Sequence, residues 1–350
     1  MKKILIALCA VATLASCTKS EVLSYDQEAI GFDNAFVDNS TRSVDDKSYS
    51  TTRMFSNFSV YGFVKGSSTD AASANVFNGI EVSKAITNTE LTSSWRYAAT
   101  QYWIAGAIYH FYAVAPFSGG WAIKTGTTPT DAGATITFTN NDGTQDLLYA
   151  GIVEQTGLAD NNQPIAFTFN HILSKVKFSF VNGYNASSAT IRVRDIMITN
   201  AYNTAEAALT STGAAWDKHA DTITITFGNA TDDQSTDAKE EVTDVSYAYN
   251  KTYESYNERF VIPAAAPDAK WNITFNVDLL VSGQLIKTYE HTAKLNTTFE
   301  PGKAYDITAT INATNIDPTN SQEPIEFTAT MSDWDTDHDD DGNNNDVTTI

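Results

Sequence analysis

The chain is poor in cysteine, and both of its cysteines lie within the first 17 residues. Cys9 falls inside an apolar N-terminal run, and Cys17 follows the end of that run. No cysteine follows residue 17, so we expect a folded body with neither a disulfide bridge nor a thiol nucleophile. The stability of that body must come from burying apolar surface in sizeable cores.

Long apolar runs and positive charge are scarce as well. After residue 17, no apolar stretch approaches the roughly 20 residues that a membrane-spanning helix needs. Any membrane attachment is therefore expected through lipid. Lys and Arg number 22 against 42 Asp and Glu, which gives a formal net charge of -20. A phosphate backbone would be repelled, so we predict no nucleic-acid partner.

Motifs of catalysis and of cofactor binding are also missing. The sequence has no GxSxG, no phosphate-binding glycine loop, no dinucleotide fingerprint and no HxxxH or HExxH arrangement. His110 and His171 lie inside apolar strand patterns, where packed residues are expected rather than metal ligands. The remaining histidines are His219, His291 and His338. We predict a protein that is not an enzyme and uses no cofactor.

The acidic C-terminal tail contains one weak candidate for a metal site. Asp337, Asp339 and Asp341 precede Gly342, as at the start of a calcium loop. The position where a bidentate glutamate would close such a loop holds Thr348. The favoured interpretation is a solvated tail, with weak calcium binding as the alternative.

What the chain does contain is the alternating pattern of β-strands. It is 42% hydrophobic and 11% aromatic, and apolar residues recur at every second position, as in strands with one buried face. Few segments show a helical period, so a second sheet is the expected cover for each apolar face. This predicts a mostly-β fold built of sandwiches. The clearest predicted strands are 135–139, 165–169, 175–180, 191–193, 222–227, 271–279, 305–311 and 325–331.

The first 17 residues have the layout of an export signal. Lys2 and Lys3 precede an apolar stretch, and small residues lead to Cys17. This arrangement resembles a bacterial lipoprotein signal, in which the cysteine is acylated and becomes the mature N-terminus. The alternative is a leader that merely contains a cysteine and is cut elsewhere.

A short strand-like element lies between this leader and the first regular strand. Residues 18–26 are polar and are expected to form a tether. Ile30, Phe32 and Phe36 then share one side of an extended run. Polar segments follow, and they contain Arg42 and Arg53.

Several ordered pieces of the sequence together resemble the fimbrillins, the pilin family of Bacteroidales that builds type V pili. The leader, the Ile30-Gly31-Phe32 element and Ser40-Thr41-Arg42 are the first of these pieces. The others are residues 58–63, 102–103, 110–116, 146–150, 167–176 and 327–334. No single piece is specific, and the resemblance rests on their order over nearly the whole chain.

The resemblance implies two transthyretin-like β-sandwich domains in tandem. The corresponding division of the chain has five parts. These are the signal peptide 1–17, the tether and removable edge strand 18–42, an N-terminal sandwich 43–170, a C-terminal sandwich 171–334 and the acidic tail 335–350.

The resemblance also implies a route of assembly. A fimbrillin is delivered as a lipoprotein to the outer membrane surface, and an arginine-specific protease then cuts its N-terminal segment. The cut releases the lipid-bearing piece with a strand, and a strand from a neighbouring pilus subunit takes its place. Here Arg42 is the preferred cleavage position and Arg53 the runner-up, the alternative being that both are ordinary solvated arginines. The removable strand would carry Ile30, Phe32 and Phe36.

A candidate donor strand lies near the C-terminus. Ile325, Phe327, Ala329 and Met331 share one face, as an inserting strand requires. The alternative is that this segment is the last internal strand of the second domain, in which case a donor strand would lie in the polar tail beyond it.

A second class of function starts from the tryptophans, since Trp side chains on β-sandwiches form stacking platforms for sugars. The protein would then be a permanently lipid-anchored surface lipoprotein that binds glycans. The six tryptophans are Trp95, Trp103, Trp121, Trp216, Trp271 and Trp334. They are dispersed, and most are expected in cores. The sequence leaves open the role of the subunit in a stalk, tip or anchor, and any host or bacterial surface ligand.

Overall fold

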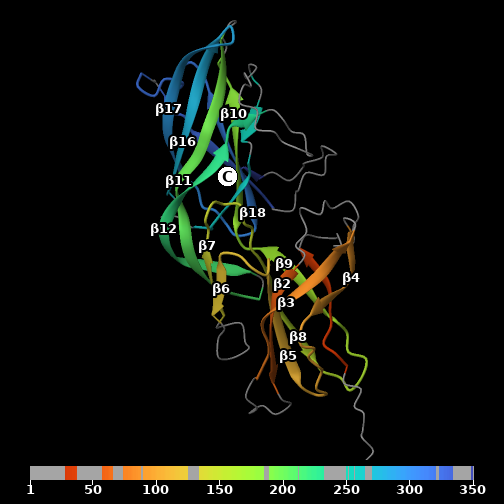
Figure 1. Ribbon diagram of the computed structural model, residues 1–350. Coiled ribbons are helices and arrows are strands. Elements are labelled where there is room, and N and C mark those ends of the chain that lie inside the picture. Colours follow the sequence, from red (N-terminus) through yellow and green to blue (C-terminus); the bar gives the residue numbers. More distant parts are fainter. Residues whose placement is uncertain are drawn as a thin grey trace, which may run out of the picture.

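The protein is built from β-strands arranged in two lobes (Figure 1). The computed structural model describes residues 28–37, 57–65, 74–87, 90–124, 134–184, 189–211, 213–231, 250, 252–255, 257–264, 270–320, 323–333 and 348–349. Within these ranges there are strands and no helix, which confirms the predicted mostly-β fold. Over the same ranges, no helix qualifies as a membrane span.

The lower lobe contains a seven-stranded N-terminal sheet, in the order β1-β9-β8-β5-β2-β3-β4. Its strands are β1 (Phe32–Val37), β2 (Asn57–Lys65), β3 (Ala74–Thr87), β4 (Glu90–Tyr97), β5 (Ile108–Ala115), β8 (Leu148–Thr156) and β9 (Ile165–His171). β1 and β4 stand at opposite ends of the strand order and yet contact each other, which shows that the sheet curls. One apolar core therefore fills the inside of this curled sheet.

The central strands of this sheet are buried on both faces. Six consecutive residues of β2 are buried, and so are the last five of β5. Gly62 in β2 lies against two aromatic rings, because a Cβ atom there would approach Phe77 and Phe111 to 2.8 Å each. Glycine is thus required at this position by close packing of the core.

A second sheet is shared between the two lobes. It has the order β17-β16-β11-β7-β6, and β12 also pairs with β11. The strands are β6 (Trp121–Lys124), β7 (Thr135–Thr139), β11 (Ala189–Leu209), β12 (Ala214–Gly228), β16 (Lys270–Val281) and β17 (Gln284–Asn296). In Figure 1 this shared sheet runs along one side of the molecule.

The long strand β11 contributes to two separate cores. Its first part places Ile191 and Val193 in the core of the upper lobe, and its last part places Ala207 and Leu209 in the core between the lobes. Irregular pairing between these parts bends the strand, as bulges do. The lobes are therefore joined by a continuous strand as well as by apolar packing.

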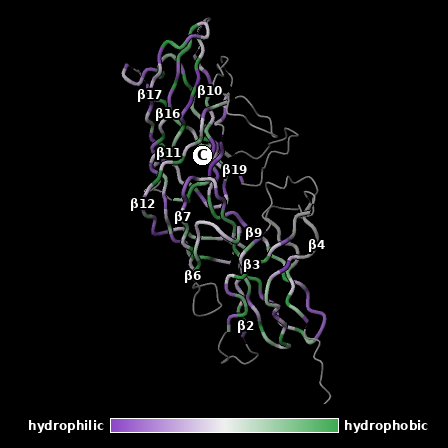
Figure 2. Tube along the Cα trace, viewed as in Figure 1, coloured by the Kyte–Doolittle hydropathy of each residue, from purple (hydrophilic) through white to green (hydrophobic). Residues whose placement is uncertain are grey.

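The upper lobe is completed by a C-terminal sheet with the order β13-β14-β10-β18-β19-β20, with β15 also on β10. Its strands are β10 (Ser174–Asn182), β13 (Ala230–Thr231), β14 (Thr252–Ser255), β15 (Arg259–Val261), β18 (Lys303–Ile311), β19 (Phe327–Asp333) and β20 (Thr348–Thr349). The largest core lies between this sheet and the shared sheet. The alternation of hydrophobic and hydrophilic residues along β10 and β16 is visible in Figure 2.

This arrangement confirms the predicted tandem sandwiches and the clearest predicted strands. The pattern at 325–331 is confirmed as β19, although the strand begins at Phe327. The division at residues 170 and 171 stays a prediction. The structure adds that β6 and β7, which precede this division, pair into a sheet with strands that follow it.

Candidate functional site

The N-terminal segment, residues 28–37, is bound at the end of the N-terminal sheet. Its strand β1 pairs with β9 in parallel, with Phe32 opposite Ile165 and Val37 opposite Phe169. The amide of Ile165 donates a hydrogen bond of 2.8 Å to the carbonyl of Gly31. The first strand of the described residues is therefore outermost in its sheet, which is the position that an exchangeable strand needs.

The residues just before β1 are held on the other side by the loop after β4. The amide of Ile30 donates to the carbonyl of Gln101 at 2.8 Å, and the amide of Trp103 donates to the carbonyl of Glu28 at 3.0 Å. The Tyr97 hydroxyl donates to the carbonyl of Ile30 at 2.7 Å. Residues 28–32 thus fill the gap between β9 and the end of β4.

Two side chains of the segment are almost completely buried. Ile30 is 1% exposed and Phe32 is 4% exposed. Burying each contributes about 1.5–3 kcal/mol. These are two of the three residues that the sequence suggests for a removable strand. The third, Phe36, lies opposite Thr168 in the ladder.

Phe32 inserts into a set of aromatic rings, which we term the Phe32 cage. Its ring stacks on one ring at a centroid distance of 5.9 Å and meets four others edge-on at 5.5–6.4 Å. Such pairs add about 0.5–1.5 kcal/mol each to simple burial. The cage residues are Phe58, Phe77, Tyr97, Phe111 and Phe167, and each comes from a different strand.

A polar contact fixes the start of the segment. The Glu28 carboxylate accepts hydrogen bonds from the Asn162 backbone amide at 2.7 Å and from the Asn162 side-chain amide at 3.0 Å. Asn162 is itself buried, and its side chain also bonds the backbone of Leu158 at both ends. The segment is therefore anchored at one end by Glu28 and in its middle by Phe32.

The Tyr97 hydroxyl is in the neutral form that this arrangement needs. Burial raises its pKa above the usual value, against an opposing effect of the hydrogen bond from the Gln101 backbone. A protonated phenol donates one hydrogen bond, and the carbonyl of Ile30 lies at the shortest distance.

Comparison with known proteins identifies the family of the chain. The model of the fimbrillin-like family matches residues 41–334. The chain belongs to the fimbrillin-like family. A search among curated proteins gave no match. Family membership supports a non-enzymatic role as a pilus or adhesin subunit at the cell surface, in contact with other pilus subunits.

Two solved structures illustrate the similarity to known proteins. A fimbrial protein from Bacteroides vulgatus is similar with a TM-score of 0.61 and 16% identity, covering 87% of this chain and 99% of that one. A candidate cell adhesion protein from Bacteroides uniformis has a TM-score of 0.47 and 18% identity over 89% and 99% of the two chains. At such identity, the first similarity supports the tandem β-sandwich fold.

The candidate donor strand of this fimbrillin-like chain lies within its own C-terminal sheet. β19 pairs with β18 from Phe327 opposite Ala309 to Asp333 opposite Lys303. Ala329 is buried, whereas Ile325, Phe327 and Met331 are partly buried against the core of the upper lobe. Its role as a donor stays a prediction.

Other predicted site residues fall outside the described ranges. They are Cys17, Arg42, Arg53 and the three aspartates Asp337, Asp339 and Asp341. Within the described part of the chain, no group of three or more His, Cys, Asp or Glu residues is placed to hold a metal ion. His110 and His171 pair instead with Glu154 at 2.9 Å and Asp146 at 2.7 Å.

The five described tryptophans all contribute to cores. Trp95, Trp103 and Trp271 are buried, and Trp121 and Trp216 pack against the core between the lobes. Trp334 lies outside the described residues. These five residues therefore serve packing rather than an open stacking platform for sugars.

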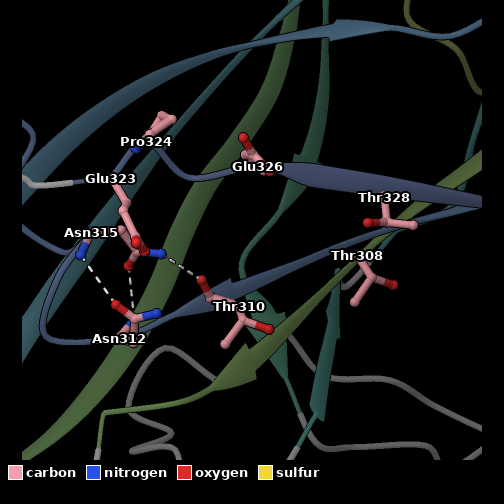
Figure 3. Close-up of a pocket in the computed structure, with 8 residues that line it drawn as sticks. All are labelled: Thr308, Thr310, Asn312, Asn315, Glu323, Pro324, Glu326 and Thr328. Atoms are coloured by element: carbon pink, nitrogen blue, oxygen red, sulfur yellow. Dashed lines mark hydrogen bonds between the residues drawn. The ribbon is translucent and has the colours of Figure 1, made fainter.

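A polar cavity of about 510 Å³ lies beside β18 and the segment before β19 (Figure 3). Thr, Asn and Glu side chains line it together with Pro324, and its lining has no aromatic ring. The side chain of Asn315 donates to the carbonyl of Thr310 at 2.9 Å, which fixes the turn after β18. The cavity thus lacks the ring face on which a sugar would stack.

Sequence reasoning identified Ile30 and Phe32 but missed Glu28, Tyr97 and Asn162. Glu28 and Asn162 are separated by 134 positions, and no pattern in the sequence connects them. The one available signal was the position of Tyr97 near the start of an aromatic-rich stretch, residues 95–112. Such a stretch indicates a core but does not say what the hydroxyl bonds.

Proposed function

We propose that this chain is a pilus subunit that is exported as a lipoprotein and assembled by protease-triggered strand exchange. Acylated Cys17 would hold the precursor at the outer membrane surface. An arginine-specific protease would then remove the N-terminal segment together with the lipid. A strand from another subunit would fill the vacated position, and the resulting fibre would be available to surface ligands.

The observation that carries this proposal is the docking of residues 28–37. The segment is outermost in its sheet, and yet Ile30 and Phe32 are almost fully buried. Its loss would open a row of unpaired groups along β9 beside the Phe32 cage. Such an edge next to an apolar groove binds another strand readily.

The order of the strands supports release after a single cut. β1 pairs with β9, whereas the next strand in the sequence, β2, pairs with β3 and β5. A cut anywhere in residues 38–56 would leave β1 joined to the body by non-covalent contacts alone. Arg42 lies five positions after the end of β1, and Arg53 lies four positions before the start of β2.

The uncut connection explains why assembly would wait for the protease. While β1 is tethered, its effective concentration at the groove reaches the order of millimolar, so a strand from another molecule competes poorly. Cleavage turns the tethered strand into one that diffuses away. The candidate donor residues Ile325, Phe327, Ala329 and Met331 would then enter the groove of the next subunit.

Arginine variants expressed on the native cell surface test this scheme. We expect Arg42→Ala to leave unpolymerised, lipid-bound subunit, with Arg53→Ala having the smaller effect. Arg96→Ala is the matched control, because Arg96 is an exposed arginine in β4. Normal polymer from the variant that lacks both Arg42 and Arg53 would refute the activation scheme.

A further inference from the structure

The segment that leads into β19 repeats the residue spacing of the docked N-terminal segment. Both contain a glutamate, an isoleucine two positions later and a phenylalanine two positions after that. The first set is Glu28, Ile30 and Phe32, and the second is Glu323, Ile325 and Phe327. The same offset places Met331 at the position of Phe36 and Ala329 at the position of Asn34. The three apolar residues Ile30, Phe32 and Phe36 are therefore each matched by an apolar residue in the C-terminal segment.

The two segments differ in how completely they are packed. Ile30 and Phe32 are buried to within a few per cent, whereas Ile325, Phe327 and Met331 are only partly buried against their own core. Glu323, Pro324 and Glu326 also border the polar cavity beside β18 (Figure 3). Moving Ile325, Phe327 and Met331 into the vacated site would increase their burial. Each Å² of apolar surface removed from water contributes about 25 cal/mol.

This pattern defines a register for the proposed strand exchange, on which the inference rests. We propose that residues 323–332 of one copy of this chain replace residues 28–37 of another copy, position for position and parallel to β9. Phe327 enters the Phe32 cage, and Ile325 takes the site of Ile30. Glu323 accepts the hydrogen bonds of Asn162 in the acceptor subunit.

The acceptor site has room for a Cβ atom where the docked segment has a glycine and the C-terminal segment does not. Gly31 corresponds to Glu326, and a Cβ atom at Gly31 would lie 3.6 Å from the nearest atom of Pro164, which is an ordinary contact. Tyr97 donates to a backbone carbonyl, which every residue offers. Selection of the register therefore falls to the Phe32 cage and Asn162, which recognise side chains four positions apart.

Disulfide trapping tests the register directly, because the sequence after Cys17 contains no cysteine. Ala166 lies opposite Asp33 in the β1–β9 ladder, and the proposed register puts Thr328 in the place of Asp33. Both Ala166 and Thr328 are exposed in the subunit. Full-length chains carrying Ala166→Cys and Thr328→Cys are expressed on the native surface, and the polymer is oxidised and separated without reductant.

We expect this pair to link neighbouring subunits at least about tenfold more than Ala166→Cys with Thr330→Cys, since two residues move a strand by about 6.6 Å. More disulfide-linked subunits with Ala166→Cys and Thr330→Cys would overturn the register while leaving strand exchange intact. Polymer without linkage in either pair would overturn residues 323–332 as the occupant. Failure of the unsubstituted chain to polymerise would overturn the proposed function together with this inference.

Charge exchange at Asn162 provides a second, independent test. Asn162→Asp would place two carboxylates together at the start of the bound segment, and we expect less polymer. Adding Glu323→Lys should restore the polymer, whereas adding Glu290→Lys, an equal charge change at an exposed position of β17, should not. Equal recovery with both lysines, or with neither, would contradict the placement of Glu323 beside Asn162.

Discussion

The first and the last long strands of the described chain are held in opposite ways. β1 pairs with β9 at only four positions, but its Phe32 and the preceding Ile30 are almost completely buried. β19 pairs with β18 at seven positions, but its Phe327 and Met331 side chains are only partly buried. Side chains thus dominate the attachment of the first strand, and the backbone ladder dominates that of the last. A strand such as β19, with partly buried side chains, can gain burial by moving to a site where those side chains pack more completely.

Matched truncations in the two strands should give the largest effect. Phe32→Ala empties the centre of a closed aromatic cage, and we expect a loss of about 3–5 kcal/mol in the free energy of unfolding. Phe327→Ala removes a partly buried ring and should cost about 1–2 kcal/mol, because less apolar surface returns to water. Urea unfolding of the uncleaved chains measures both values. Equal losses would break the comparison between the strands.

A change in the acceptor alone sharpens the same comparison. In Gly62→Ala the new methyl group meets Phe77 and Phe111 of the Phe32 cage at 2.8 Å, so we expect about 1–3 kcal/mol of destabilisation from overpacking. Gly213→Ala is the control, because a Cβ atom there meets nothing within 4 Å. Faster proteolysis around β1 in Gly62→Ala, with Gly213→Ala unchanged, would place the damage at the cage. Equal behaviour of both variants would contradict it.

The smallest expected effect is the part of the alkaline pH dependence that comes from Tyr97, whose hydroxyl bonds the segment before β1. Burial raises the pKa of Tyr97 above 10.0, so the stability from its hydroxyl is fully present below pH 10 and is lost as pH rises through the folded-state pKa. Tyr97→Phe lacks the hydroxyl and should therefore lose less stability than the unsubstituted chain as the pH rises above about 9. The measurement is the urea midpoint of both chains as a function of pH. Subtracting one curve from the other removes the contribution of the other tyrosines. Parallel curves would mean that the hydroxyl contributes nothing to holding β1.

Strands with one apolar face could be predicted from the sequence because alternation is a local property. This is why β10, β16 and β18 were found, and why Ile30 and Phe32 were recognised as an apolar face. The pairing of β7 with the far end of β11 was not found, since it depends on bulges that redirect one long strand between two cores. The contact of Glu28 with Asn162 was missed because hydrogen bonds across 134 positions leave no periodic trace.

The mature N-terminus on the native cell surface tests the central claim most directly. Intact-mass and peptide analysis of surface polymer should show subunits that begin at Ser43, or at Met54 if Arg53 is the site, and that have lost residues 28–37 with the lipid. Subunits that all retain acylated Cys17 and the whole segment would contradict removal of β1 and, with it, assembly by strand exchange.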